Sequence, residues 1–349
     1  MLTSRRATVI GAAVTVLVAV AGLMWAKWMP YIGKALHAAR TGQWSGSDIL
    51  HTGGVTAADA PSWHAATSFF TAYVGAIWPA LVVALLLSAC VQAFLPRSWL
   101  PAMLNRRHPV SSAAAGAAAG MPSMMCTCCA APVTVTLRRN GVDQGAAVAY
   151  WLGNPLLNPA VLVFLALVAP WQWTLTRLVV GAAAVLGAAV LVARLAPRRA
   201  EPALTPDPDV TREASESTPA AVRFAAALVR LCVVLVPEYF VMVLAVGAFR
   251  GWLLTIVDPD HRSLLIVVVA AIVGTLMVIP TAGEIPILQG LALLGVSSGV
   301  LGALLITLPA VSLPGIAMVA RTFGSRATMV ISTVVVAAGL IAALALSVV

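Results

Sequence analysis

Seven long apolar runs divide this chain into segments of membrane length. Each run holds about 20 residues or more, which is the length that an α-helix needs to cross a hydrocarbon core of roughly 30 Å. Polar stretches with proline and glycine separate the runs. The pattern predicts an all-α polytopic membrane protein, with spans at about 9–28, 69–93, 144–168, 174–195, 222–248, 299–320 and 327–347.

Composition and charge agree with this class and indicate which kinds of partner to expect. Hydrophobic residues make up 61% of the 349 positions and charged residues only 9%, so the expected surroundings are a lipid bilayer. The net charge of +9 comes mostly from short loops beside helix ends, and no basic run with interleaved aromatics offers a nucleic-acid surface. We therefore expect no nucleic-acid partner. The oligomeric state stays open.

The basic loops predict the orientation, because Lys and Arg concentrate on the cytoplasmic side. Arg5 and Arg6 place the N-terminus in the cytoplasm, and the first run lacks a small-x-small cleavage site, which indicates a retained anchor helix. The stretch 30–68 reads as a long polar loop outside the cell membrane (inner or plasma). Polar residues at 196–221 indicate a flexible cytoplasmic linker.

Two further apolar segments, 110–137 and 264–294, are interrupted by proline-rich breaks. If 110–137 crossed the membrane, Arg138 and Arg139 would emerge outside and every later span would be inverted. The charge rule therefore favours a re-entrant hairpin, and Pro280–Pro286 gives the second segment the same design. Interrupted segments in matching positions indicate a transporter binding site.

A shift of 154 residues aligns the two halves of the chain. Glycines and prolines that set backbone shape coincide, namely Pro132 with Pro286, Gly141 with Gly295 and Pro155 with Pro309. We expect two inverted repeats, each with a broken or re-entrant hairpin, that exchange access by rocking against each other. The domains would be 1–68 (anchor helix and extracytoplasmic loop), 69–195 (first repeat), 196–221 (linker) and 222–349 (second repeat).

Sulfur side chains are concentrated in one short stretch of the first hairpin. Thiolates and thioethers prefer Cu(I), zinc and other thiophilic centres, although single Cys and Met residues commonly pack as hydrophobes. On a regular helix residues i and i+2 diverge by about 200°, so an unwound tip would be needed for two of the thiols to meet, and the pair is open. The cluster is Met121, Met124, Met125, Cys126, Cys128 and Cys129.

Two carboxylates lie within apolar segments, where ionisable groups are costly and mark ion or proton paths. Glu284 follows the second break, and Glu238 lies in run 222–248. Either could couple transport to a proton gradient, or could simply be satisfied by a helix N-terminus or by an arginine such as Arg230 or Arg177. Asn154 and Asn158 precede proline breaks, where they could line a cavity or cap freed carbonyls.

These motifs resemble a known family. Cys126-Thr-Cys-Cys-Ala-Ala-Pro132, the Asn154–Pro159 motif and Glu284-Ile-Pro286 are similar to the predicted-permease family that includes the organoarsenical efflux permease ArsP. The resemblance covers most of 69–347 and leaves 1–68 outside it. It implies efflux of trivalent organoarsenicals by a thiol-rich permease, without fixing the substrate, and includes Pro132 in the site motif. Cys129 stands where the family motif has glycine, which could add a third thiol.

Three functions remain open from the sequence. The first is secondary efflux of a small thiophilic substrate, without a cofactor and with no enzymatic step. The second is transport or sensing of Cu(I), in which Met121, Met124 and Met125 would act as metal ligands. The third is a membrane thiol oxidoreductase that uses Cys126 with Cys128 or Cys129. No Walker-type nucleotide loop occurs in the chain, so a nucleotide-driven pump is not expected.

Overall fold

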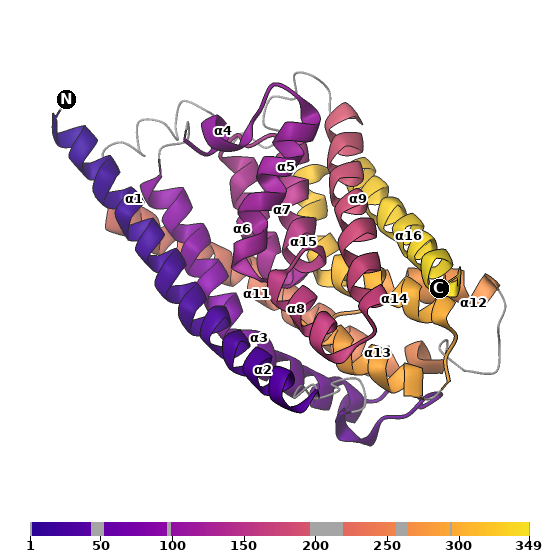
Figure 1. Ribbon diagram of the computed structural model, residues 1–349. Coiled ribbons are helices and arrows are strands. Elements are labelled where there is room, and N and C mark those ends of the chain that lie inside the picture. Colours follow the sequence, from indigo (N-terminus) through magenta and orange to yellow (C-terminus); the bar gives the residue numbers. More distant parts are fainter. Residues whose placement is uncertain are drawn as a thin grey trace.

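In a computed structural model the described residues, 2–42, 52–95, 99–195, 219–255, 264–293 and 295–348, form helices and connecting turns, with no strand among them. Figure 1 shows the helices gathered into one bundle. Most of the linker 196–221 lies outside the described residues. The all-helical class is confirmed.

The N-terminal region is helical for longer than the sequence suggested. α1 (Leu2–Leu23), a π-helical turn (Met24–Trp28) and α2 (Met29–Thr41) follow one another without a loop, along one side of the bundle (Figure 1). The prediction of a loop starting at residue 30 was therefore wrong. Pro30 occupies the first turn of α2, a position where proline is tolerated because its missing N–H costs least there.

The remaining helices form two series with the same order. The first series is α3 (Trp63–Phe94), α4 (Trp99–Leu104), α5 (Pro109–Gly120), α6 (Thr127–Arg139), α7 (Gln144–Leu156), α8 (Pro159–Val168) and α9 (Trp171–Leu195). The second is α11 (Ala220–Thr255), α12 (Leu264–Leu276), α13 (Glu284–Leu293), α14 (Ser298–Ala310), α15 (Leu313–Phe323) and α16 (Ser325–Val348). Apart from α4, each helix of the first series has a counterpart in the second.

Among the described residues, five helical stretches are long and apolar enough to cross a membrane, which supports a multi-pass protein. They are Val9–Thr41, Trp63–Phe94, Gln144–Val168, Trp171–Leu195 and Ser325–Val348. A span was also expected at 299–320; α14 and α15 together are long and apolar enough for one, but they are bent by 53° at Val311 and Ser312 and form either a broken span or a re-entrant loop. Pro309 and Pro314 flank this break, and proline both removes a helix hydrogen bond and restricts the residue before it.

The bounds of the two series repeat the 154-residue shift. α7 and α14 correspond residue for residue at both ends, and α9 and α16 begin at corresponding positions. Gly141 and Gly295, with φ of 85° and 83°, make the same left-handed turn before these helices, a conformation that glycine adopts without steric cost. Helices that begin and end at corresponding residues are expected if the chain contains a duplicated unit.

α3 and α11 run in opposite directions. The guanidinium of Arg223, near the start of α11, donates to the Ala93 carbonyl at the end of α3 (2.9 Å), and Arg250 near the end of α11 donates to Ala65 at the start of α3 (2.8 Å). Inverted repeats need this antiparallel arrangement of the two opening helices. The inverted symmetry of the whole repeats stays a prediction.

The first interrupted segment leaves one end of the bundle and returns to it. Asn105, before α5, donates to the Gly141 carbonyl (3.1 Å) and accepts from the Asp143 amide (2.6 Å), both after α6. The hydroxyl of Ser112 also contacts the Asp143 carboxylate at 3.4 Å. Residues 105–143 therefore form a hairpin whose two ends are joined, as the charge rule predicted, while its depth in a bilayer stays a prediction.

Small residues allow this hairpin to pack closely on α7. A side chain at Gly116 of α5 would overlap the Ala146 carbonyl, and one at Gly120 would come within 2.6 Å of the Tyr150 carbonyl. On the facing helix, Gly153 lies against Ala117. Close backbone approach through small residues is how membrane helices gain van der Waals contact. The hairpin tip is thereby held against α7.

Candidate functional site

The tip of the first hairpin is where the three clustered cysteines lie. A short 3-10 turn (Met121–Ser123) ends at Met124, whose φ of 50° is left-handed. Cys126 then has extended backbone (φ −75°, ψ 166°) immediately before α6 begins. Cys128 and Cys129 fall in the first turn of that helix. The tip is therefore unwound only as far as Cys126.

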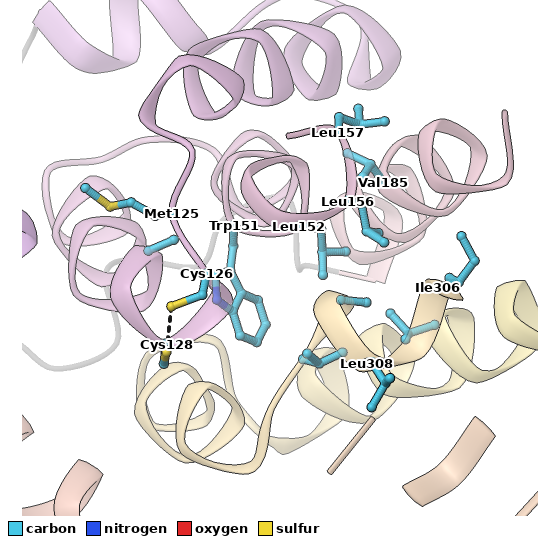
Figure 2. Close-up of a cluster of buried hydrophobic side chains, with 14 of the residues drawn as sticks. Met125, Cys126, Cys128, Trp151, Leu152, Leu156, Leu157, Val185, Ile306 and Leu308 are labelled. Carbon is cyan, nitrogen blue, oxygen red and sulfur yellow. Dashed lines mark hydrogen bonds between the residues drawn. The ribbon is translucent and has the colours of Figure 1, made fainter. Parts of the chain in front are cut away.

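This half-unwound backbone brings all three sulfur atoms together. The Sγ of Cys126 lies 2.9 Å from that of Cys128 and 3.3 Å from that of Cys129, and all three atoms are within 4.8 Å of one another. Each side chain is at least 96% buried. The sequence left open whether Cys128 or Cys129 pairs with Cys126, and in the structure Cys126 contacts both. Figure 2 shows the contact between Cys126 and Cys128.

The three thiols form a potential ligand set. In the described part of the chain, this is the one group of three or more His, Cys, Asp or Glu side chains close enough to share an ion. Three buried sulfur atoms suit a thiophilic centre and give no oxygen ligands to a hard cation. A fourth contact comes from the hydroxyl of Tyr73 in α3, which lies 3.1 Å from the Cys128 Sγ.

Asn154 fixes the loop that leads to the cysteines. Its side-chain oxygen accepts from the Ser123 hydroxyl and from the Met125 amide (3.3 Å), and its amide donates to the Tyr150 carbonyl (2.9 Å). Asn154 is fully buried. It therefore positions the hairpin tip on α7 through bonds that a buried polar group requires.

The start of α6 also contacts the break in the second series of helices. Trp151, fully buried in α7, donates from its indole nitrogen to the Thr127 carbonyl (2.8 Å), and Figure 2 shows its ring beside Cys126. The hydroxyl of Thr127 lies 3.1 Å from that of Ser312, the residue before α15. The thiol-bearing helix end is thus in contact with both halves of the protein.

A small cavity lies between the tips of the two hairpins. The space between atoms there, including its open mouth, is about 210 Å³. Cys126 lines the cavity from the first hairpin, and Thr281 and Glu284 line it from the second. The proline breaks of α7 and α14 complete the wall; the other lining residues are Pro155, Val161, Ile279, Pro280, Ala282 and Pro309. Of the predicted site residues, Cys126 and Glu284 therefore reach the same cavity.

Glu284 is the first residue of α13, where the helix dipole favours a negative charge, and it is paired with Arg177. The Nη2 of Arg177 in α9 lies 2.7 Å from Glu284 Oε1, and both side chains are buried. Arg177 also donates to the carbonyls of Pro155 (2.8 Å), Leu156 (3.4 Å) and Leu305 (3.4 Å). One of the two arginines proposed as a partner from sequence is thus the actual one.

Asn158 and Pro132 do not line the cavity. Asn158 caps α8 by accepting from the amides of Ala160 (3.0 Å) and Val161 (3.4 Å). Pro132 is buried within α6. The side chain of Glu238, in α11, lies outside what the structure describes.

Of the three methionines of the tip, Met125 points away from the thiols. Met125 is fully buried, and in Figure 2 its side chain extends away from the Cys126–Cys128 pair. Met121 and Met124 are partly buried and pack against the hydrophobic core. Met125 is adjacent to the thiols in sequence, but its side chain does not extend toward them as a mixed sulfur site for Cu(I) would require (Figure 2).

Sequence reasoning missed the contribution of the N-terminal helix. Lys27, in the π-helical turn, is 5% exposed and donates to the hydroxyls of Thr281 (3.0 Å) and Tyr31 (3.4 Å). Trp28 beside it donates to the Pro122 carbonyl at 2.8 Å. This helix therefore contacts the tips of both hairpins. A lone lysine in a strongly apolar stretch was the signal that could have revealed it, whereas nothing in the pattern around Tyr73 pointed to the thiols.

Comparisons with known proteins agree with this architecture. The sequence matches the family described as predicted permease (ArsP_1) over residues 62–348. It is 40% identical over 329 residues to UPF0718 protein YraQ of Escherichia coli strain K12, covering 93% of this chain and 91% of that protein. No solved structure matches the chain. With most of its length matched, the chain belongs to the predicted-permease family.

Proposed function

We propose that the protein is a secondary transporter that exports a small thiophilic substrate, a trivalent organoarsenical, by alternating access. One observation carries the proposal: three buried cysteine sulfurs converge within 4.8 Å, and one of these cysteines lines a cavity between the two hairpin tips. Broken segments that meet at a central site are the arrangement expected of a transporter. Membership of a permease family supports transport over catalysis.

The thiol geometry suits reversible capture of trivalent arsenic. A monosubstituted arsenical, R–As(OH)₂, reacts with two thiols to give R–As(SR)₂ and two molecules of water, so no oxidant or reductant is needed. Cys126, which contacts both neighbours, can form this pair with either Cys128 or Cys129. The third thiol offers a route for exchange, and a labile site suits transport better than a closed four-sulfur cage of the structural-zinc type.

Glu284 is the candidate for coupling to a proton gradient. It lines the cavity near Cys126 and is paired with Arg177, which also holds the break of α7. Protonation of the carboxylate would remove the ionic attraction and free the guanidinium, which would connect proton binding to movement at the break. Glu238 remains a second candidate from its sequence position alone.

The decisive measurement is uptake of a trivalent methylarsenical into everted membrane vesicles. We expect uptake by the wild type and loss of most uptake in Cys126→Ser, with a smaller loss in Cys128→Ser. Cys90→Ser is the matched control, because Cys90 is also buried but lies alone in α3. Thiol-independent uptake, or no uptake by a well-expressed wild type, would contradict the arsenical substrate.

Coupling is tested in the same vesicles. Glu284→Gln should reduce uptake driven by an imposed proton gradient while exchange of substrate at equilibrium continues. If the variant retains full gradient-driven uptake, Glu284 is not the coupling group. Glu238→Gln examined in parallel separates the two carboxylates.

Cu(I) remains a second candidate because three thiolates can surround it without the methionines. Replacing Met121, Met124 and Met125 together by leucine separates the substrates: a thiol-based arsenical carrier keeps its activity, whereas a carrier that uses the methionines loses Cu(I) uptake. Equal uptake of Cu(I) by this variant and loss of it in Cys126→Ser would indicate a thiol-only copper site.

Thiol redox chemistry has one geometric argument in its favour. Cys126 and Cys129 have Cys-x-x-Cys spacing at the start of a helix, and their sulfurs are 3.3 Å apart. Such spacing is used by disulfide oxidoreductases. A reversible mass decrease of two hydrogens at these cysteines, linked to turnover of a redox partner, would support it.

A further inference from the structure

Lys27 is buried in the candidate span Val9–Thr41 and has no acidic partner among the described residues. Among the described residues, no carboxylate lies within ion-pair distance of its ammonium group, whose hydrogen-bond acceptors are the hydroxyls of Tyr31 and Thr281. The Tyr31 ring lies beneath it, 5.2 Å from the nitrogen to the ring centroid. Arg177, also buried, has Glu284 at 2.7 Å. A buried charge is costly unless an opposite charge or several hydrogen bonds accompany it.

The ammonium group lies one residue behind the wall of the cavity between the two hairpin tips. Its hydrogen-bond partner Thr281 lines that cavity together with Cys126. A negative group that enters the cavity would therefore lie close to a positive charge, which is separated from the cavity by the Thr281 hydroxyl.

The placement of Lys27 is fixed by contacts at both hairpin tips. The Tyr31 hydroxyl donates to the Thr281 carbonyl (3.3 Å), and the Thr281 hydroxyl reaches the Met124 carbonyl (3.4 Å). Trp28 binds the Pro122 carbonyl on the other tip. These bonds hold the lysine side chain in one position, which a specific charge–charge contact requires.

We propose that Lys27 is a specificity-determining residue, whose positive charge makes the thiol site select thiophilic substrates that carry a negative group. This inference rests on the proposed function of the cysteine cluster and adds a charge requirement to it. The substrate class is a small molecule with a soft, thiol-reactive centre and an anionic oxygen substituent. The thiols bind the soft centre, and the ammonium group pairs with the anionic oxygen through a charge-assisted hydrogen bond.

Two probes with the same thiol chemistry and different charge test this inference. Phenylarsine oxide is neutral, and 4-carboxyphenylarsine oxide adds one carboxylate. Binding of each is measured by calorimetry on the purified full-length protein in nanodiscs. We expect the wild type to bind the carboxylate probe about tenfold more tightly, and Lys27→Met and Lys27→Gln to lose this preference while still binding phenylarsine oxide. Lys27→Arg should restore part of it.

Lys34→Met is the matched control, because it removes the same charge from a lysine of α2 that also lies over the Tyr31 ring, 5.9 Å from the nitrogen to the ring centroid. It should keep the preference. The proposal is overturned if the wild type shows no preference, if both Lys27 variants keep it, or if they weaken both probes equally, which would make Lys27 a counter-charge for the thiols. Failure of both probes to bind a folded wild type, or binding unchanged in Cys126→Ser, would instead reject the thiol site itself.

Discussion

The guanidinium of Arg177 lies 2.7 Å from the carboxylate of Glu284, and both side chains are buried. The pair joins α9, from the first series of helices, to the start of α13 in the second. The same guanidinium reaches the Pro155 carbonyl at the break of α7. One buried contact therefore connects a proline break of the first half to the hairpin tip of the second.

Removing either partner of this pair should destabilise the protein. Breaking a buried ion pair costs about 3–5 kcal/mol because it leaves an uncompensated charge. Arg177→Met should cost more than Glu284→Gln, since it also removes the donor to Pro155, Leu156 and Leu305. Thermal unfolding of the purified variants measures this order, and the double variant should recover part of the loss. Equal stability of wild type and both single variants would contradict it.

Gly116 should not tolerate a side chain. A methyl group there would overlap the Ala146 carbonyl, and overpacking of this kind costs about 1–3 kcal/mol. A methyl group at Gly187 in α9 would meet nothing within 4 Å, so Gly187→Ala should be neutral or stabilise by up to about 1 kcal/mol. Only the Gly116→Ala variant should therefore have a lower melting temperature than the wild type. A Gly116→Ala variant as stable as the wild type would indicate that α5 and α7 lie further apart.

The hairpin predicts that both of its ends are accessible from one side of the membrane. In a background with the native cysteines replaced by serine, Val110→Cys and Arg139→Cys should react with an impermeant maleimide from the cytoplasmic face. Trp171→Cys, at the opposite end of the bundle from the hairpin ends, should react from the other face. Labelling of Val110→Cys and Arg139→Cys from different faces would show that this segment spans the membrane.

Trp151 should be needed to hold the thiol-bearing end of α6. Its indole donates to the buried Thr127 carbonyl, and an unsatisfied buried acceptor costs about 1–3 kcal/mol. Trp151→Phe should therefore lower stability and weaken phenylarsine oxide binding. Trp28→Phe removes a bond of the same length at an exposed position and should change stability less. Equal losses of stability and of phenylarsine oxide binding in the two variants would argue against a special role for Trp151.

Much of the fold was readable from local pattern. Apolar runs of membrane length, the prolines that interrupt them and the 154-residue shift anticipated most of the helices, because backbone hydrogen bonding in an apolar environment leaves few alternatives to helix. The errors fell where local signals compete with context. The loop expected from residue 30 is helical as far as Thr41, and the bend between α14 and α15 within the expected span 299–320 was not anticipated.

The site was anticipated only in part. Cys126, Cys128 and Cys129 were identified from their chemistry, and Glu284 from its position beside a break. The Cys-x-x-Cys spacing of Cys126 and Cys129 was overlooked, although it is visible in the sequence. Met125 was grouped with the thiols because it is adjacent in sequence, but side-chain direction depends on the local backbone, which turns at Met124.

By itself the sequence determined the membrane class, the duplicated helix pattern and the thiol chemistry, since each depends on composition and spacing within short segments. Tertiary structure alone decided that Glu284 pairs with Arg177, that Tyr73 contacts Cys128, and that Lys27 contacts Thr281 at the cavity. Each of these contacts joins residues of separate segments of the chain, and Tyr73 and Cys128 are 55 positions apart in the sequence. Such contacts depend on how the helices pack against one another, and no periodicity along the chain specifies that packing.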